Sequence, residues 1–282
     1  MHITVTSKND PAFEAMFDNL IRDVFGFSFA PWLSRKVWNE RYESYSIIQD
    51  GEMLSNVCIY KTDLRIGGQA VRAHQFGAVA TRESERKRGL SRQLMDHVLS
   101  LYPDVPAFLY ANPSVIDFYP QFGFRQADTY QPYIVATIDN PPGKVRQYSG
   151  EDAFVYRMLC GKRVYSDVMD CMNTQSIALF HLLLSYPEDL YFLPNCGALI
   201  VAKQEGSKLF LADVVCERSI TFEELEKELP FFGIESVAFG FCPDWLGVQP
   251  NWEQIDGNKE PFFLRGDWNL PALFRFPALS AT

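Results

Sequence analysis

Apolar residues recur at helical spacing near the start of the chain. Asp10 precedes Pro11, a pairing typical of a helix N-cap followed by proline at the first helical position. The apolar face of this predicted helix comprises Phe13, Met16, Phe17, Leu20, Ile21 and Val24. A bend rich in glycine and phenylalanine, FGFSFAPW, follows, and a second helix is expected near Pro31.

Patterns typical of strands come next. A turn at Asp50-Gly51 separates two apolar runs and predicts a hairpin. Strands are expected, in chain order, at 45–48, 53–60, 69–81 and 105–111. A helical pattern covers 90–101, and a short helix is expected from about Pro113. This order of elements predicts a mixed α/β sheet.

The second part of the chain repeats the coarse order of helices, hairpin, strand, helix and strand. Helical patterns cover 151–161, 174–185 and 221–229, and strand patterns cover 197–203, 208–215 and 235–241. The Pro-rich segment 140–147 separates the parts, so we predict domains at 1–139 and 148–282. The last part, 246–282, is rich in aromatic residues and is expected to pack onto the rest.

Composition bounds the class of protein. The 282 residues are 47% hydrophobic and carry a formal charge of -9, which disfavours a nucleic-acid partner. A solvated acidic surface or a cationic substrate explains this charge. The six cysteines form no C-x-x-C pair and the four histidines are scattered, so we expect no metal site and free thiols in the cytoplasm. Neither a signal peptide nor a membrane span is expected, and a homo-oligomer is compatible with the sequence.

The stretch 82–94, RESERKRGLSRQL, places cations where a helix begins. A helix N-terminus disfavours each cation by about 0.3–1 kcal/mol. Free backbone N–H groups there bind phosphate, and Gly89 permits the unusual backbone angles that such a loop needs. The alternative is a solvated basic turn that pairs with Glu83 and Glu85.

Two sequence blocks resolve this choice by resemblance. The strand VAT (79–81) followed by RKRGLS (86–91) resembles the acetyl-CoA motif of the GNAT acetyltransferases, Q/R-x-x-G-x-G/A, with Ser91 where the family prefers Gly or Ala. NPSVIDFYPQFGF (112–124) resembles the next motif of that family. The resemblance implies acetyl-CoA as cofactor and direct acetyl transfer to the amine of a small, cationic acceptor.

The second part lacks these motifs. At the matching place Thr221 and Glu224 form a T-x-x-E capping box, which satisfies a helix start without a ligand. The chain therefore resembles a tandem of GNAT-like folds, cofactor-binding and degenerate, similar to the enhanced-intracellular-survival (Eis-like) acetyltransferases but without a full third domain.

The resemblance also assigns roles to residues. The cofactor-binding set that it implies is Val79, Ala80, Thr81, Arg86, Lys87, Arg88, Gly89, Leu90, Ser91, Arg92 and Asn112. Tyr119 is the implied catalytic acid, because a phenol suits a thiolate leaving group. The base is open between His74, a Thr282 carboxylate that requires the tail to fold back, and water.

The acceptor site is expected from aromatic segments. Its walls should be formed by Phe27, Phe29 and Trp32, by the region of Tyr130 to Tyr133, and by the second part of the chain. Acidic residues in these walls would suit a cationic amine. Two other functions stay open at this point: an acyl-CoA-binding sensor or assembly protein without catalysis, and an aminoacyl-transferring tandem fold, which the acidic charge disfavours.

Overall fold

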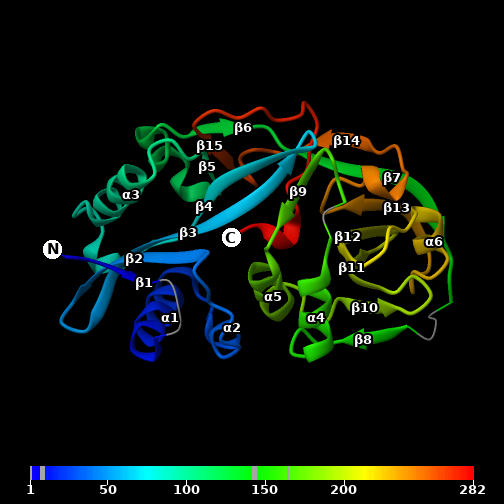
Figure 1. The fold of residues 1–282 in the computed structure, drawn as a ribbon, viewed down its shortest axis with the longest axis horizontal. Coiled ribbons are helices and arrows are strands. Elements are labelled where there is room, and N and C mark those ends of the chain that lie inside the picture. The colour runs from blue at the N-terminus through cyan, green and yellow to red at the C-terminus, as the bar shows by residue number, and fades with distance from the viewer. Residues whose placement is uncertain (1, 7–9, 142–144, 164) are drawn as a thin grey trace.

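Two mixed β-sheets lie side by side in the computed structural model, which describes residues 2–6, 10–141, 145–163 and 165–282 (Figure 1). The first sheet contains β1 (Ile3–Thr6), β2 (Tyr42–Gln49), β3 (Glu52–Ile66), β4 (Gln69–Thr81), β5 (Ala107–Tyr110), β6 (Arg125–Ala127), β9 (Met169–Met172) and β15 (Phe262–Arg265). The second contains β7 (Tyr130–Ile138), β8 (Arg146–Tyr148), β10 (Leu190–Leu193), β11 (Ala198–Glu205), β12 (Lys208–Val215), β13 (Ile234–Phe239) and β14 (Asn251–Gln254).

Helices connect and cover the strands. The α-helices are α1 (Pro11–Phe25), α2 (Ala30–Leu33), α3 (Leu90–Leu101), α4 (Ala153–Gly161), α5 (Gln175–Leu184) and α6 (Phe222–Glu226). Short 3-10 turns lie at Glu83–Glu85, Pro113–Phe118, Pro120–Phe122, Asp244–Leu246 and Ala278–Ser280. The predicted bounds of the strand 69–81 and the helix 90–101 agree with β4 and α3, whereas the helix expected from Pro113 consists of 3-10 turns.

The two sheets share one strand pattern, as predicted for a tandem. The order is β3-β4-β5-β15-β6 in the first sheet and β11-β12-β13-β7-β14 in the second. The pairs β4–β5 and β12–β13 are parallel, and the other strand pairs among the described residues are antiparallel. A helix crosses between the strands of each parallel pair, α3 in the first sheet and α6 in the second.

The halves exchange strands. β15, late in the chain, pairs with β5 and β6 of the first sheet, and β9 pairs with β3. Conversely, β7, which belongs to the first half of the sequence, pairs with β13 and β14 of the second sheet. Sheet membership thus crosses the predicted boundary at 140–147, of which residues 142–144 lie outside the described residues, and the division into 1–139 and 148–282 stays a prediction.

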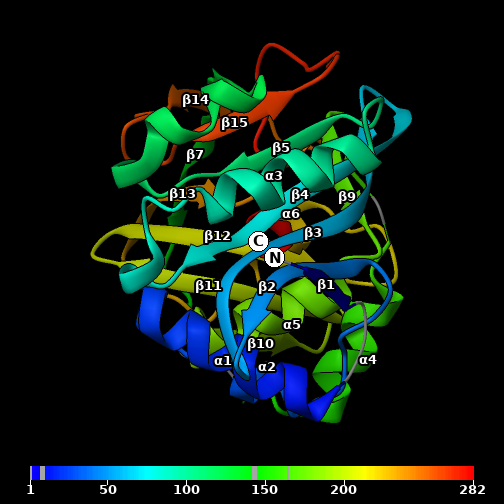
Figure 2. The ribbon, with the colours of Figure 1, turned by 90° about the vertical axis from the view of Figure 1, so that its left-hand side faces the viewer.

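Helices α1 and α3 cover opposite faces of the first sheet. On β3, Cys58 and Tyr60 pack with α1, whereas Val57 and Ile59 pack with α3, as the alternation of side chains along a strand requires. Asp10 caps α1 by accepting from the Ala12 N–H (3.0 Å), as predicted. Figure 2 shows α3 lying over β4 and β5.

The second half is fastened to the first by buried contacts. The Trp32 indole N–H donates to the carbonyl of Ser176 on α5 (2.7 Å), and the Tyr60 hydroxyl donates to the carbonyl of Asn173 (2.6 Å). The aromatic tail packs as predicted, since Phe262, Phe274 and Phe276 belong to a core cluster shared with β3 and β5. No helix among the described residues is long and apolar enough to cross a membrane.

Candidate active site

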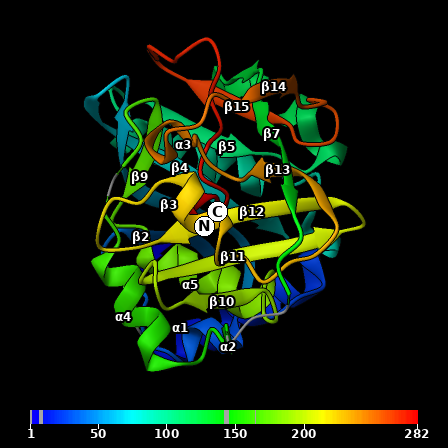
Figure 3. The ribbon, with the colours of Figure 1, turned by 90° about the vertical axis from the view of Figure 1, so that its right-hand side faces the viewer.

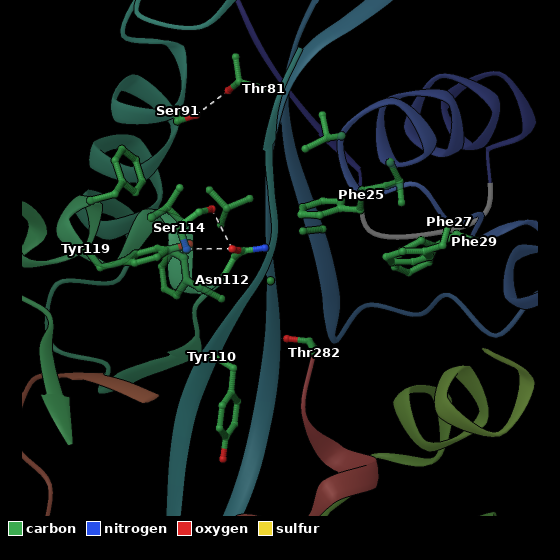
Figure 4. Close-up of a pocket in the computed structure, with 18 of the residues that line it drawn as sticks. Phe25, Phe27, Phe29, Thr81, Ser91, Tyr110, Asn112, Ser114, Tyr119 and Thr282 are labelled. Carbon is green, nitrogen blue, oxygen red and sulfur yellow. Dashed lines mark hydrogen bonds between the residues drawn. The ribbon is translucent and has the colours of Figure 1, made fainter. Parts of the chain in front are cut away.

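The site begins where β4 and β5 separate. These parallel strands pair only at His74–Ala107 and Gln75–Phe108, and beyond Gln75 the edge of β4 that faces β5 has no strand partner among the described residues. A cavity of about 550 Å³ opens between them and reaches both α1 and the Asn112–Tyr119 segment (Figure 4). The separation leaves main-chain groups of β4 available to a ligand.

A β-bulge shapes the wall of β4 in this cavity. The register shifts between Asn56 and Cys58, so that Ala78 and Val79 together oppose Val57. Ala78 has a φ of 46°, which costs energy in a residue that carries a side chain. The buried Asn56 holds this conformation, because its amide Nδ2 donates to the carbonyl of Ala78 (3.0 Å).

Asn56 is itself fixed by two buried hydroxyls. Its Oδ1 accepts from Ser44 Oγ (2.5 Å) and Ser46 Oγ (2.8 Å), and all three residues are fully buried. The amide orientation is therefore determined, with its donor directed at the bulge. Sequence analysis missed this network; the alternation of Ser44 and Ser46 on a strand beside Asn56 was its available signal.

The N-terminus of α3 has no internal cap. Gly89 is the N-cap residue with a φ of 78°, and no side chain hydrogen-bonds to this helix start. Lys87 also has a positive φ, 66°. Within the described part of the chain, the backbone N–H groups of residues 87–92 find no hydrogen-bond acceptor. A row of free donors at a helix start is suited to bind an anion.

The basic residues of this loop divide into two groups. The Arg86 side chain lines the cavity, and its Nε donates to the carbonyl of Thr81 (3.4 Å). Arg88 pairs with Glu85, and Arg92 donates to the Gln121 amide oxygen and lies over the Phe122 ring. The internal pairing considered as an alternative thus forms at Arg88, beside a helix start that stays uncapped.

Small polar side chains line the cavity between this loop and the bulge. Thr81 Oγ1 and Ser91 Oγ, both in the lining, lie 2.5 Å apart, and Thr81 Oγ1 lies 2.7 Å from Oγ of the buried Ser55, which is outside the lining. Asn112 Oδ1 accepts from the Ser114 N–H (3.0 Å), which leaves its amide N–H₂ group without a partner among the described residues. These groups can bind a polar chain along the cavity.

Tyr119 lies in the same cavity. Its ring packs against Phe118, Phe124 and Phe263, the last of which comes from the exchanged strand β15. Burial raises the pKa of its hydroxyl to about 12, and that hydroxyl has no hydrogen-bond partner in the described chain. Tyr119 is therefore protonated at neutral pH and free to donate.

The two candidate bases have different surroundings. His74 does not line the cavity; it packs edge-on against Tyr102, and burial together with the nearby Lys61 charge lowers its pKa to about 4. Thr282 does line the cavity, because the tail folds back between the sheets and reaches Gly77. A Cβ on Gly77 would lie 2.6 Å from Thr282 Oγ1, so only glycine allows this approach.

Buried hydrogen bonds hold the tail in place. In the amide orientation that satisfies both of its ends, Gln75 donates to the Ser280 carbonyl (3.0 Å) and accepts from the Thr282 N–H (2.6 Å). His181 Nε2 donates to the carbonyl of Ala281 (2.6 Å). Gln75 and His181 were not among the predicted site residues, because nothing in their sequence neighbourhood indicates a contact with the end of the chain.

Some of the predicted site residues line the cavity, and the others lie outside its lining. The described lining includes six of them, Val79, Thr81, Arg86, Ser91, Asn112 and Tyr119, and omits Ala80, Lys87, Arg88, Gly89, Leu90 and Arg92. Phe27, Phe29 and Trp32 line the opposite wall as expected. Two expectations about this wall are wrong: Tyr130 and Tyr133 lie on β7, which joins the second sheet, and none of the described lining residues is acidic.

In the second half, the helix start and the strand gap that correspond to the cavity of the first half are both closed. The predicted capping box is confirmed at α6, where Thr221 Oγ1 accepts from the Glu224 N–H (3.2 Å) and Glu224 accepts from the Thr221 N–H (2.8 Å). Beyond the β12–β13 pairing, the Ala278 N–H donates to the Gly240 carbonyl (2.7 Å). The turn Ala278–Ser280 contacts β12 of the second sheet, which faces the viewer in Figure 3, so the protein's own tail occupies this gap.

Comparison with known proteins finds a domain model that matches part of the chain and solved structures with a similar fold. A model described as an acetyltransferase (GNAT) domain matches residues 8–127. The fold resembles a probable N-acyltransferase from Enterococcus faecalis (12% identity, 94% of this chain and 73% of that chain, TM-score 0.60). It also resembles Eis1 from Mycobacterium abscessus (12%, 93% and 73%, TM-score 0.55) and a putative acetyltransferase from Pyrococcus horikoshii (11%, 99% and 96%, TM-score 0.52). No curated protein matches the sequence.

Proposed function

Residues 8–127 match a model of the GNAT acetyltransferase domain, and from that premise we propose that the chain is an acetyl-CoA-dependent N-acetyltransferase acting on the amine of a small acceptor. One observation carries the proposal. A single cavity is lined by Arg86 and Ser91, beside the free N–H groups at the start of α3, by Tyr119, and by a separate aromatic wall. Cofactor, proton donor and acceptor thus have adjoining places in one space.

The residues present fit coenzyme A. The free N–H groups of 87–92 and Arg86 would hold the pyrophosphate. The unpaired edge of β4 from Val79 to Thr81 and the Asn112 amide would hold the pantetheine arm. Bound there, acetyl-CoA supplies an activated acetyl group as a thioester.

The chain's own groups then serve the transfer. Overall, an N–C bond forms, a C–S bond breaks, and one proton passes from the amine to the sulfur. The main-chain N–H groups at the bulge of Ala78 and Val79 are suited to stabilise the carbonyl oxygen. Tyr119 keeps its proton at neutral pH and is assigned as the donor to sulfur.

The amine proton needs an acceptor at the other side of the cavity. Thr282 lines that side, whereas His74 lies outside the cavity, so the arrangement supports a carboxylate on Thr282 where that residue ends the chain. Water is the remaining acceptor. His74 is assigned no step.

Calorimetric titration with acetyl-CoA tests the binding half of this proposal. Wild type should bind, and Gly89→Asp should lose affinity by about 100-fold or more, because a carboxylate and a strained backbone replace the anion-binding N-cap. Gly206→Asp is the matched control, since Gly206 also has a positive φ (62°) but lies in the turn between β11 and β12. Wild type without affinity would refute the proposal.

A second function is favoured by one observation. None of the described residues that line the cavity carries a carboxylate or imidazole side chain to act as base. A non-catalytic acyl-CoA-binding sensor would need none. Tight acetyl-CoA binding without acetylation of any amine in a broad panel would favour that function over transfer.

A further inference from the structure

The acceptor side of the cavity is an aromatic wall. Phe25 at the end of α1 and Phe27 and Phe29 in the following bend face the side of β4 opposite to Tyr119 and Asn112 (Figure 4), and Phe180 on α5 lines the cavity and packs against Phe29. The rings form a continuous row: centroids are 6.1 Å apart for Phe25–Phe27, 5.5 Å for Phe27–Phe29 and 4.7 Å for Phe29–Phe180. Both halves of the protein contribute to it.

Part of the apolar surface of this wall is exposed to solvent. Phe25 and Phe27 are each 40% exposed, although Phe29 in the same row is almost fully buried. Exposure of adjacent phenylalanines to water beside a cavity is unfavourable. A ligand with apolar surface that covers them gains the free energy of burying them. The row offers both faces and edges to an incoming ring.

A buried carboxylate fixes the wall. Asp18, which is 4% exposed, accepts from the Phe29 N–H (2.6 Å) and from the Ser28 hydroxyl (2.9 Å). The Trp32 indole is tied to Ser176 on α5. The bend is therefore preorganised, and a ligand spends little free energy on ordering it.

The charges of the cavity restrict the ligand further. Arg86, at the cofactor end, is the one charged side chain that the described lining residues contribute. A polyamine or an aminosugar would have to bury several ammonium or hydroxyl groups against phenyl rings, with no carboxylate side chain among the described lining residues to pair with them. A monoamine has one charge, which is lost from the reacting nitrogen, and an aromatic wall tolerates a single cation.

We propose that the acceptor is a monoamine whose amine is borne on an aromatic or bulky apolar body, with that body seated on Phe25, Phe27 and Phe180. The inference rests on the proposed N-acetyl transfer and adds the class of acceptor. It distinguishes this cavity from one built for polycationic substrates.

Steady-state kinetics on an amine panel tests it. With acetyl-CoA as donor, 2-phenylethylamine and tryptamine should have kcat/KM roughly 10- to 100-fold above n-butylamine, because a ring is buried. They should exceed spermidine and kanamycin by at least as much. Phe27→Ala and Phe180→Ala should remove most of this preference while acetyl-CoA affinity, measured calorimetrically, is retained. Phe232→Ala is the control, since Phe232 is 65% exposed and lies outside the cavity.

The outcomes separate this inference from the proposed function. Turnover with equal or higher kcat/KM for spermidine or kanamycin overturns the acceptor class and leaves N-acetyl transfer intact. A flat amine panel, with octanoyl-CoA preferred over acetyl-CoA and that preference lost in Phe27→Ala, would assign the wall to a long acyl chain instead. Absence of turnover with every amine would overturn both.

Discussion

At the scale of single residues, the site depends on buried polar groups that hold the backbone in an unfavourable conformation. Ala78 has a φ of 46°, and the amide of Asn56 holds its carbonyl, while Ser44 and Ser46 orient that amide. A strained residue costs of order 1–3 kcal/mol and persists only when its surroundings fix it. The bulge directs main-chain groups of β4 into the cavity, so Asn56 is a positioning residue.

Asn56→Asp tests this role, because it keeps an acceptor for both serine hydroxyls and removes the donor to the Ala78 carbonyl. We expect kcat to fall by about 10- to 100-fold, since small displacements at the reacting centre have such effects. Asn56→Leu should instead lower the free energy of unfolding by about 1–3 kcal/mol, because it leaves buried hydroxyls without a partner. Equal kcat in wild type and Asn56→Asp, with urea denaturation confirming a folded variant, would refute the role.

At the scale of elements, the site is a gap between two parallel strands and a tail that reaches it. β4 and β5 diverge after Gln75, and the same residue uses both ends of its amide to hold Ser280 and Thr282. In the second sheet the equivalent gap lies next to residues 278–280 of the same tail. One segment therefore fills the gap of the second sheet and forms a wall of the first.

Gly77→Ala tests whether the position of Thr282 against Gly77 affects turnover. The new Cβ would lie 2.6 Å from Thr282 Oγ1 and 3.0 Å from Thr282 Cβ, so Thr282 must move. We expect kcat/KM for the amine to fall roughly 10-fold or more with little change in acetyl-CoA affinity. Gly77→Ala combined with Thr282→Gly removes both clashing atoms and should restore activity. No rescue in this double variant would mean that Gly77 acts through some other contact.

The predicted elements show what local pattern can reveal. The spacing of Leu90, Leu94, Met95 and Val98 predicts α3, and all four are buried. Asp10 and Thr221 were identified as caps because capping depends on residues three positions apart or fewer. The loop 86–92 was singled out because its charges disagree with the helix that follows.

The exchanged strands and the tail were beyond such patterns. The sequence of β15, FFLR, contains nothing that indicates which sheet the strand joins. β7 follows strands of the first sheet in the chain but pairs within the second sheet. Pairing across some 150 residues of sequence is decided by tertiary packing rather than by local preference. Acidic residues were expected in the acceptor walls because they would suit a cationic amine, and sequence patterns do not show which side chains reach one cavity.

At the scale of the whole molecule, two copies of one sheet pattern have different uses. The first has an uncapped helix start and an open gap, and the second has a capping box and an occupied gap. The second half contributes Phe180 on α5, the tail at Thr282, and Phe263 behind Tyr119. The cavity is complete only when both halves are present, although the groups proposed to bind the cofactor come from the first.

Transfer to 2-phenylethylamine by the full chain tests the central claim most directly. Product is measured by mass spectrometry for wild type, Tyr119→Phe and the matched control Tyr110→Phe, which changes another tyrosine of the cavity. We predict N-acetyl product from wild type and Tyr110→Phe, and a kcat about 10²-fold lower in Tyr119→Phe with acetyl-CoA affinity kept. Because the pKa of Tyr119 is about 12, its ionisation should cause no loss of rate from pH 7 to 10. No product from wild type, or full activity in Tyr119→Phe, would contradict the account.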